Sequence, residues 1–218
     1  MLEALWVTFK LAAVSTVILL LLSTPLAWWL ARGRARHLRT VGEAVVALPL
    51  ILPPTVLGFY LLILLSPTGF IGQFTEGGLA FRFSGLVIGS VIYSLPFVVQ
   101  PLSASFAQID SRLLQLGSSQ GLGRLQMLRQ LIFPASKHAF ITAGVLGFAH
   151  TIGEFGVVLM IGGNIPGETQ VLSILLFDEV ETLNFARAHR IAGSLLVASF
   201  ILLLLLYGWQ RRSRHVAT

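Results

Sequence analysis

Few side chains in this sequence could do chemistry, and one pair of them lies inside an apolar stretch. Glu154 is the only acidic residue within such a stretch, and His150 precedes it by four residues, which places both side chains on one face of a helix. The pair could form the centre of a membrane enzyme, but no metal-ligand spacing accompanies it. The other histidines are scattered along the chain: His37, His138, His189 and His215. We therefore expect neither a catalytic site nor a metal site.

An ionised Glu154 is energetically unfavourable within an apolar stretch. A carboxylate in the middle of a membrane raises the free energy of insertion by roughly 2.5–3.5 kcal/mol. Because Glu154 lies past the middle of its stretch, two interpretations stay open. One is a structural role, as a helix cap, a dimer contact or the brace of a gate, and the other is a direct role in a path. The nearby Gly153 and Gly156 would allow a neighbouring backbone to approach closely.

Prolines mark two other apolar stretches. Pro53 and Pro54 are adjacent in one stretch, and Pro96 lies in the next. Proline in a soluble helix interior costs about 3 kcal/mol, and membranes tolerate it where neighbours or water satisfy the freed carbonyl groups. The double proline indicates either a packing kink or a broken helix that lines a path or gate. The candidate pathway or gate residues are Pro53, Pro54, Thr55, Pro96, Gly153, Glu154, Phe155 and Gly156.

The composition indicates that helices in a membrane position these residues. Of the 218 residues, 55% are hydrophobic and 11% are charged, whereas a soluble domain carries about 25% charged residues. A net charge of +6 would suit nucleic acid, but the cations lie in short loops next to apolar runs, so no nucleic acid is expected. The sequence has no cysteine, which excludes disulfides and thiolate sites.

Five apolar stretches are long enough to cross a bilayer, which requires about 20 helical residues each. We predict an all-α, polytopic transmembrane protein with a single domain over residues 1–218. The first stretch has an apolar run too long for a signal peptide and its cluster of arginines follows it, so we expect it to be a retained span. The predicted spans are about 11–31, 44–65, 85–109, 139–163 and 191–210.

The distribution of lysine and arginine predicts the orientation of these spans. Eleven of the 15 cations follow the first, third and fifth spans, which places them on one side of the membrane. The long loop 110–138 is then cytoplasmic, with the N-terminus outside and the C-terminus in the cytoplasm. The loop 164–190, on the outer side, contains apolar residues at helical spacing, which predicts an interfacial or re-entrant amphipathic helix.

The cytoplasmic loop reads QLGSSQGLGRLQMLRQLIFP from Gln115 to Pro134, which resembles the coupling motif of ABC importer permeases. That motif is written E-A-A, three residues, G, nine residues, I-x-L-P. Gly121 and Pro134 match it with the spacing kept, whereas Gln115, Leu116 and Gly117 stand in place of E-A-A. Gly117 and Gly121 are expected to let a partner surface approach closely. The candidate coupling residues are Gln115, Leu116, Gly117, Gly121, Leu122, Arg124, Leu125, Leu131, Phe133 and Pro134.

Three further stretches look like those of permease subunits of molybdate ABC importers, which are related to the sulfate and thiosulfate permeases. They read LPLILPPTVLGFYLL at 48–62, IGEFG at 152–156 and NIPGET at 164–169, so the resemblance covers nearly the whole chain. It implies the type I ABC importer permease fold in the bacterial inner membrane. It also implies a function as the permease subunit of an ATP-driven molybdate importer.

The same resemblance implies the partners. Two copies of the chain would form the path, surrounded by membrane lipid. Two cytoplasmic ABC ATPase subunits would bind and hydrolyse ATP, since this sequence has no glycine-rich phosphate loop. A periplasmic oxyanion-binding protein would deliver the ion. No cofactor is expected on this chain, which is a transport subunit and not an enzyme. The residues expected to face the binding protein are Asn164, Pro166, Gly167, Glu168 and Thr169.

Alternative functions stay open at this point. Tungstate, sulfate and thiosulfate are alternative oxyanions for an importer of this kind. A self-sufficient anion channel or secondary carrier belongs to another class. Its marks would be a membrane-embedded charge relay or an inverted repeat, and the sequence shows neither.

Overall fold

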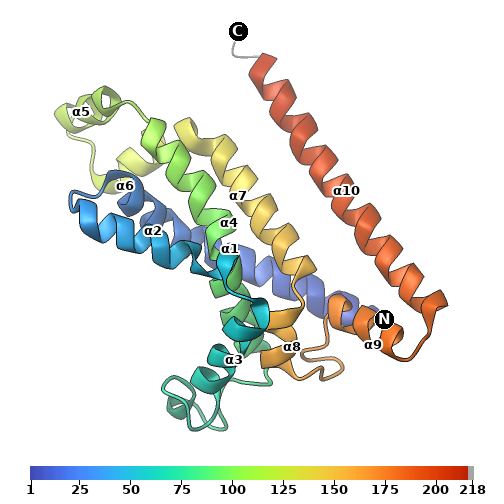
Figure 1. The fold of residues 1–218 in the computed structure, drawn as a ribbon. Helices are drawn as coiled ribbons and strands as arrows, with labels where there is room; N and C mark the ends of the chain where they lie inside the picture. The colour runs from blue at the N-terminus through green and yellow to red at the C-terminus, as the bar shows by residue number, and fades with distance from the viewer. Residues whose placement is uncertain (216–218) are drawn as a thin grey trace.

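The computed structural model describes residues 1–215, without the side chains of residues 124 and 210–215. Within these residues there is no β-strand, which confirms the predicted all-α class. Figure 1 shows the arrangement of the helices. They are α1 Leu2–Arg32, α2 Arg36–Ile51, α3 Pro54–Leu65, η1 Gly72–Phe74, α4 Phe83–Gln108, α5 Ser111–Ser119, α6 Arg124–Met127, η2 Leu128–Ile132, α7 Phe133–Gly153, α8 Gly156–Gly162, α9 Leu172–Glu181 and α10 Phe185–His215.

Four helical segments in the described chain are long and apolar enough to cross a membrane: α1, α4, Leu125–Gly153 and α10. Leu125–Gly153 joins α6 to α7 through η2, which is a π-helical turn. Helices α2 and α3 supply a fifth crossing if they are taken together, although they are bent by 110° at the break between them.

The stretch 44–65, predicted as one continuous span, is therefore divided between α2 and α3. Leu52 has an extended backbone, with φ −68° and ψ 136°, because the ring of Pro53 disfavours a helical residue before it. Pro53 is extended as well, since it precedes Pro54. Pro54 then begins α3 at a position where a missing N–H costs nothing. The double proline is a chain break and not a mild kink.

The stretch 139–163, also predicted as one span, is divided between α7 and α8. Helix α7 begins earlier, at Phe133, with Pro134 in its first turn, and it ends at Gly153. Glu154 then takes an extended conformation, with φ −62° and ψ 137°, and α8 resumes at Gly156. This break contains no proline, so it depends on contacts from other helices.

Helix α4 is the central helix of the molecule. In the most apolar 18-residue stretch of α4, 56% of the residues are buried. The corresponding share for α10, which stands apart along one side in Figure 1, is 11%. Val98 and Leu102 of α4 pack against Leu19 and Ala27 of α1 in the largest apolar cluster. Pro96 lies inside α4 without ending it. Residues that meet α4 are thus held by the best-packed part of the protein.

The two ends of the molecule carry different segments. Figure 1 shows α5 and the C-terminal end of α10 at one end, and α3, α8 and α9 at the other. Helix α9 lies in the loop 164–190, where an amphipathic helix was predicted, and its buried Leu172 and Leu175 pack with Ala4 and Ile191. The N-terminus therefore lies beside this loop, far from α5.

Close packing of α7 on α4 is testable with two glycines of α7. A Cβ at Gly147 would lie 2.7 Å from Cγ2 of Val98, whereas a Cβ at Gly144 would lie 3.6 Å from Cδ1 of Leu20. We predict that Gly147→Ala lowers the apparent melting temperature of the detergent-purified protein, because overpacking typically costs about 1–3 kcal/mol. Tryptophan fluorescence during heating measures the transition.

Gly144→Ala is the matched control for this experiment. Both substitutions favour the helix by up to about 1 kcal/mol through propensity, but only one meets a buried side chain. The Gly144→Ala protein should therefore melt at or above the wild-type temperature. Equal melting temperatures for the two variants would contradict the contact between Gly147 and Val98.

Candidate functional site

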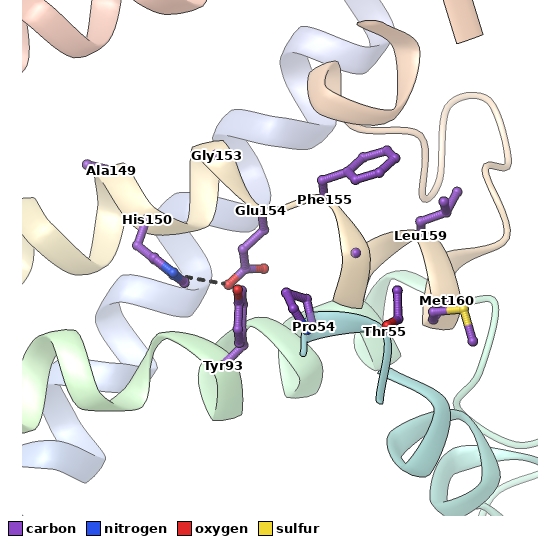
Figure 2. A pocket seen from close by; sticks show the side chains of 11 residues that line it. Pro54, Thr55, Tyr93, Ala149, His150, Gly153, Glu154, Phe155, Leu159 and Met160 are labelled. Carbon is purple, nitrogen blue, oxygen red and sulfur yellow. Dashed lines mark ion pairs between the residues drawn. The ribbon is translucent and has the colours of Figure 1, made fainter. Parts of the chain in front are cut away.

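The two helix breaks lie side by side and border one cavity. A Cβ at Gly156, the first residue of α8, would lie 2.8 Å from Cβ of Pro54, the first residue of α3. A cavity of about 470 Å³ opens at this contact, and we call it the break cavity (Figure 2). It is lined by Pro54, Thr55, Tyr93, Ala149, His150, Gly153, Glu154, Phe155, Gly156, Leu159 and Met160.

The Glu154 side chain borders the break cavity but is only 2% exposed. Its Oε2 accepts a hydrogen bond of 2.5 Å from the Ser90 hydroxyl, and its Oε1 accepts one of 2.7 Å from the Ser94 hydroxyl. Both serines lie on α4, one turn apart. The hydroxyl of Ser173, on α9, donates to the main-chain carbonyl of Glu154. Glu154 therefore ties the α7–α8 break to α4 and to α9.

His150 joins the same hydrogen-bond network from the last turn of α7. Its Nδ1 lies 2.9 Å from Oγ of Ser94 and 3.7 Å from Oε1 of Glu154, the pair marked in Figure 2. The imidazole stacks on Phe97 with ring centroids 3.9 Å apart, and it also contacts Tyr93. Ser94 donates its hydroxyl proton to Glu154, so it is not presented to His150 as a nucleophile to a base. The geometry does not favour a membrane enzyme.

Six of the eight predicted pathway or gate residues line the break cavity. They are Pro54, Thr55, Gly153, Glu154, Phe155 and Gly156. In the described part of the chain, Pro53 and Pro96 do not line it: Pro53 precedes α3, and Pro96 is buried within α4. The sequence predictions missed Ser90, Ser94 and Tyr93. Two serines four residues apart in an apolar stretch were an available signal, because that spacing places them on one face of a helix.

Four side chains supply the polar lining of the break cavity. Thr55, Tyr93 and His150 supply hydroxyl and imidazole groups, and no lysine or arginine is among the described lining residues. The one acidic side chain there, Glu154, has no attraction for an anion. The described residues also contain no group of three or more histidine, aspartate or glutamate side chains placed to hold a metal ion.

The predicted coupling loop folds into a capped helix. Asp110 caps the start of α5, because its Oδ1 accepts from the Arg112 N–H at 2.9 Å. At the other end, the Gly121 N–H donates to the Ser118 carbonyl and the Leu122 N–H donates to the Gly117 carbonyl. These two hydrogen bonds form a Schellman cap. Gly121 has φ +75°, in the left-handed region that favours glycine. The glycine of the motif thus ends α5.

The candidate coupling residues are divided between an exposed and an inward face. Gly117 is buried, and a Cβ there would lie 2.7 Å from Cδ1 of Leu131. The close approach that Gly117 permits is therefore to this chain itself, which corrects the expectation that it faces a partner. Leu122 and Leu131 are half-buried. The Arg124 side chain lies outside the described residues. The exposed candidates are Gln115, Leu116, Gly121, Leu125, Phe133 and Pro134.

The loop 164–169 is held in shape by its own polar residues. Asn164, at φ +60°, donates through Nδ2 to Asp178 of α9 at 2.8 Å and accepts from the Gln170 amide at 2.9 Å. The buried Thr169 hydroxyl donates to the Gly162 carbonyl at 2.7 Å. Two of the predicted binding-protein contacts, Asn164 and Thr169, therefore shape the loop. The other three, Pro166, Gly167 and Glu168, are exposed at its tip.

Two transport permeases are similar to this sequence over nearly its whole length. The chain is 51% identical over 214 residues to the molybdenum transport system permease protein ModB of Azotobacter vinelandii, covering 96% of this chain and 94% of that protein. It is 34% identical over 212 residues to the sulfate transport system permease protein CysT of a Synechocystis species, covering 94% of this chain and 74% of that protein.

A solved structure shows the same fold. A chain of the bacterial alginate ABC transporter, in complex with an alginate pentasaccharide-bound periplasmic protein, superposes with a TM-score of 0.77 at 15% identity. The match covers 97% of this chain and 78% of that chain, and confirms the predicted ABC importer permease fold. Residues 23–212 also match the family of binding-protein-dependent transport system inner membrane components. The chain therefore belongs to this family of inner-membrane transport components.

Proposed function

We propose that this chain is the permease subunit of an ATP-driven importer and that two copies form a path for molybdate across the inner membrane. The observation that carries the proposal is the 51% identity to a molybdenum transport permease over 96% of the chain. Sulfate permeases are also relatives, at 34% identity. Tungstate, sulfate and thiosulfate are therefore the alternative ions.

The break cavity supports a conduit role for this chain. Pro54, Glu154 and Gly156 place two helix breaks at one point, where small movements of α3 or α8 would open or close a passage. Its lining carries no described lysine or arginine that would hold an anion tightly. Selection of the ion then falls to a periplasmic oxyanion-binding protein, received at the exposed tip of the loop 164–169.

Energy comes from outside this chain in the proposed complex. Two ATPase subunits bind ATP in the cytoplasm, and each receives α5 of one permease. Exposed apolar side chains, Leu116 at 58% and Leu125 at 66%, supply a contact surface there. Helix α5 lies at the end of the molecule opposite to the N-terminus and the loop 164–169, as this orientation requires (Figure 1).

Reconstitution tests the proposed function directly. We expect proteoliposomes that contain this chain, its ATPase and its binding protein to accumulate labelled molybdate only when ATP is present. Competition among molybdate, tungstate and sulfate then identifies the preferred ion. Uptake by this chain alone, without nucleotide, would instead support a self-sufficient channel or carrier and would refute the proposal.

The Schellman cap at Gly121 provides a test of coupling. We predict that Gly121→Val reduces co-purification of the ATPase, because a left-handed conformation costs a non-glycine residue about 1–2 kcal/mol and α5 would end differently. Gly123→Val is the control, since Gly123 is exposed and has no positive φ. Membrane insertion of both variants should match wild type. Equal recovery of the ATPase with the two variants would count against a docking role for α5.

The Glu154 network provides a second test. Glutamine at this position keeps one acceptor oxygen where Glu154 has two, so one hydroxyl of the Ser90 and Ser94 pair loses its acceptor. An unsatisfied buried group costs roughly 1–3 kcal/mol, and we expect Glu154→Gln to change the initial rate of ATP-driven uptake by about fivefold or more. Glu181→Gln, at an exposed position on α9, is the control. Wild-type uptake by the Glu154→Gln complex would contradict a bracing role for Glu154.

A further inference from the structure

Arg32, the last residue of α1, grips the end of α4. Its Nε donates to the Phe106 carbonyl at 3.1 Å, and its Nη2 donates to the Ile109 carbonyl. Phe106 lies in the last turn of α4, where its carbonyl also accepts from the Ile109 N–H at 3.4 Å, and Ile109 is the C-cap that follows the helix. The guanidinium also lies 6.0 Å from the ring centroid of Trp28. A positive charge at a helix C-terminus is favourable as well, because it opposes the helix dipole.

Arg32 binds α4 at the point where α4 connects to α5, the helix of the predicted coupling loop. Ile109 is the C-cap of α4, with an extended backbone at ψ 126°, and Asp110 is the N-cap of α5. We call Ile109 and Asp110 the α4–α5 joint. No other residue separates the two helices, so any displacement of α5 reaches α4 first at the position that Arg32 holds.

Helix α5 is connected to the rest of the protein by this joint, by Leu114 on the largest apolar cluster and by Gly117 against Leu131. A cavity of about 610 Å³ separates α5 and the segment after it from α1 and α4. Trp28 and Phe106 line it on the side of α1 and α4, while Leu114 and Leu122 line it on the side of α5. Space of this size beneath a helix lets the helix tilt. Without a fixed joint, α5 would tilt into this cavity and its motion would not reach α4.

We propose that Arg32 is a positioning residue that makes α1, α4 and α5 move as one body, so that motion of the ATPase reaches the break cavity. This inference rests on the proposed function. The link to the cavity is direct, because α4 also carries Ser90 and Ser94, the two donors to Glu154. Arginine is suited to the task, since its planar fork donates to two carbonyls at once, whereas lysine is a point charge.

The test is the number of ATP molecules hydrolysed per molybdate imported by the reconstituted complex. We expect Arg32→Gln to raise this ratio roughly tenfold, the order of effect of one charge-assisted hydrogen bond, with assembly and ATP hydrolysis retained. Arg34→Gln is the matched control, because Arg34 is exposed, carries the same charge and lies two residues after Arg32. Its ratio should equal that of wild type. Arg32→Lys should give an intermediate ratio.

A second readout examines the joint itself. Hydrogen–deuterium exchange of peptides covering residues 104–113 should be faster in Arg32→Gln than in wild type and unchanged in Arg34→Gln. A wild-type ratio in Arg32→Gln and Arg32→Lys, with unchanged exchange, would overturn the role of Arg32. Failure of the wild-type complex to import molybdate would instead refute the proposed function, and the exchange measurement would still decide whether Arg32 holds the joint.

Discussion

The interior of a bilayer contains no water. Each backbone N–H or C=O group that loses its helical partner at a break therefore needs another partner within the protein. Two spans of this chain are broken, at Leu52–Pro53 and at Glu154–Phe155. At the second break, Ser173 satisfies the freed carbonyl of Glu154, and Ser90 and Ser94 satisfy its carboxylate. These contacts fix the second break, and the close approach of Gly156 to Pro54 sets it beside the first, where the break cavity lies.

The Glu154 contacts bear on the two interpretations of this residue. Its carboxylate is engaged by two serines and is almost fully buried, as expected of a brace. It also borders the cavity with His150 and Thr55, so a movement of the brace would alter the cavity wall. A structural role and an effect on the path are therefore compatible. The buried carboxylate positions helices, and Thr55 and His150 line the cavity beside it.

Helix α4 connects the two regions that the proposed mechanism needs. Its middle holds Glu154, and its last turn is held by Arg32 beside α5. Because α4 is the most buried of the long helices, it transmits displacement without much internal adjustment. The loop 164–169 lies at the opposite end, tied by Asn164 to α9. Signals from a cytoplasmic and an external partner would therefore converge on the break cavity.

Sequence by itself determined the all-α class, the apolar stretches and the membership of a permease family, because these follow from local composition and spacing. It left the double proline as either a kink or a break, and the fold decided for a break. Only the tertiary structure decided that the span holding Glu154 is broken, that Gly117 faces inward, and that Arg32 bonds to α4. Ser90 and Ser94 lie 64 and 60 residues from Glu154 in the chain. Local patterns show that a buried polar group needs partners, but packing of distant helices decides which groups those are.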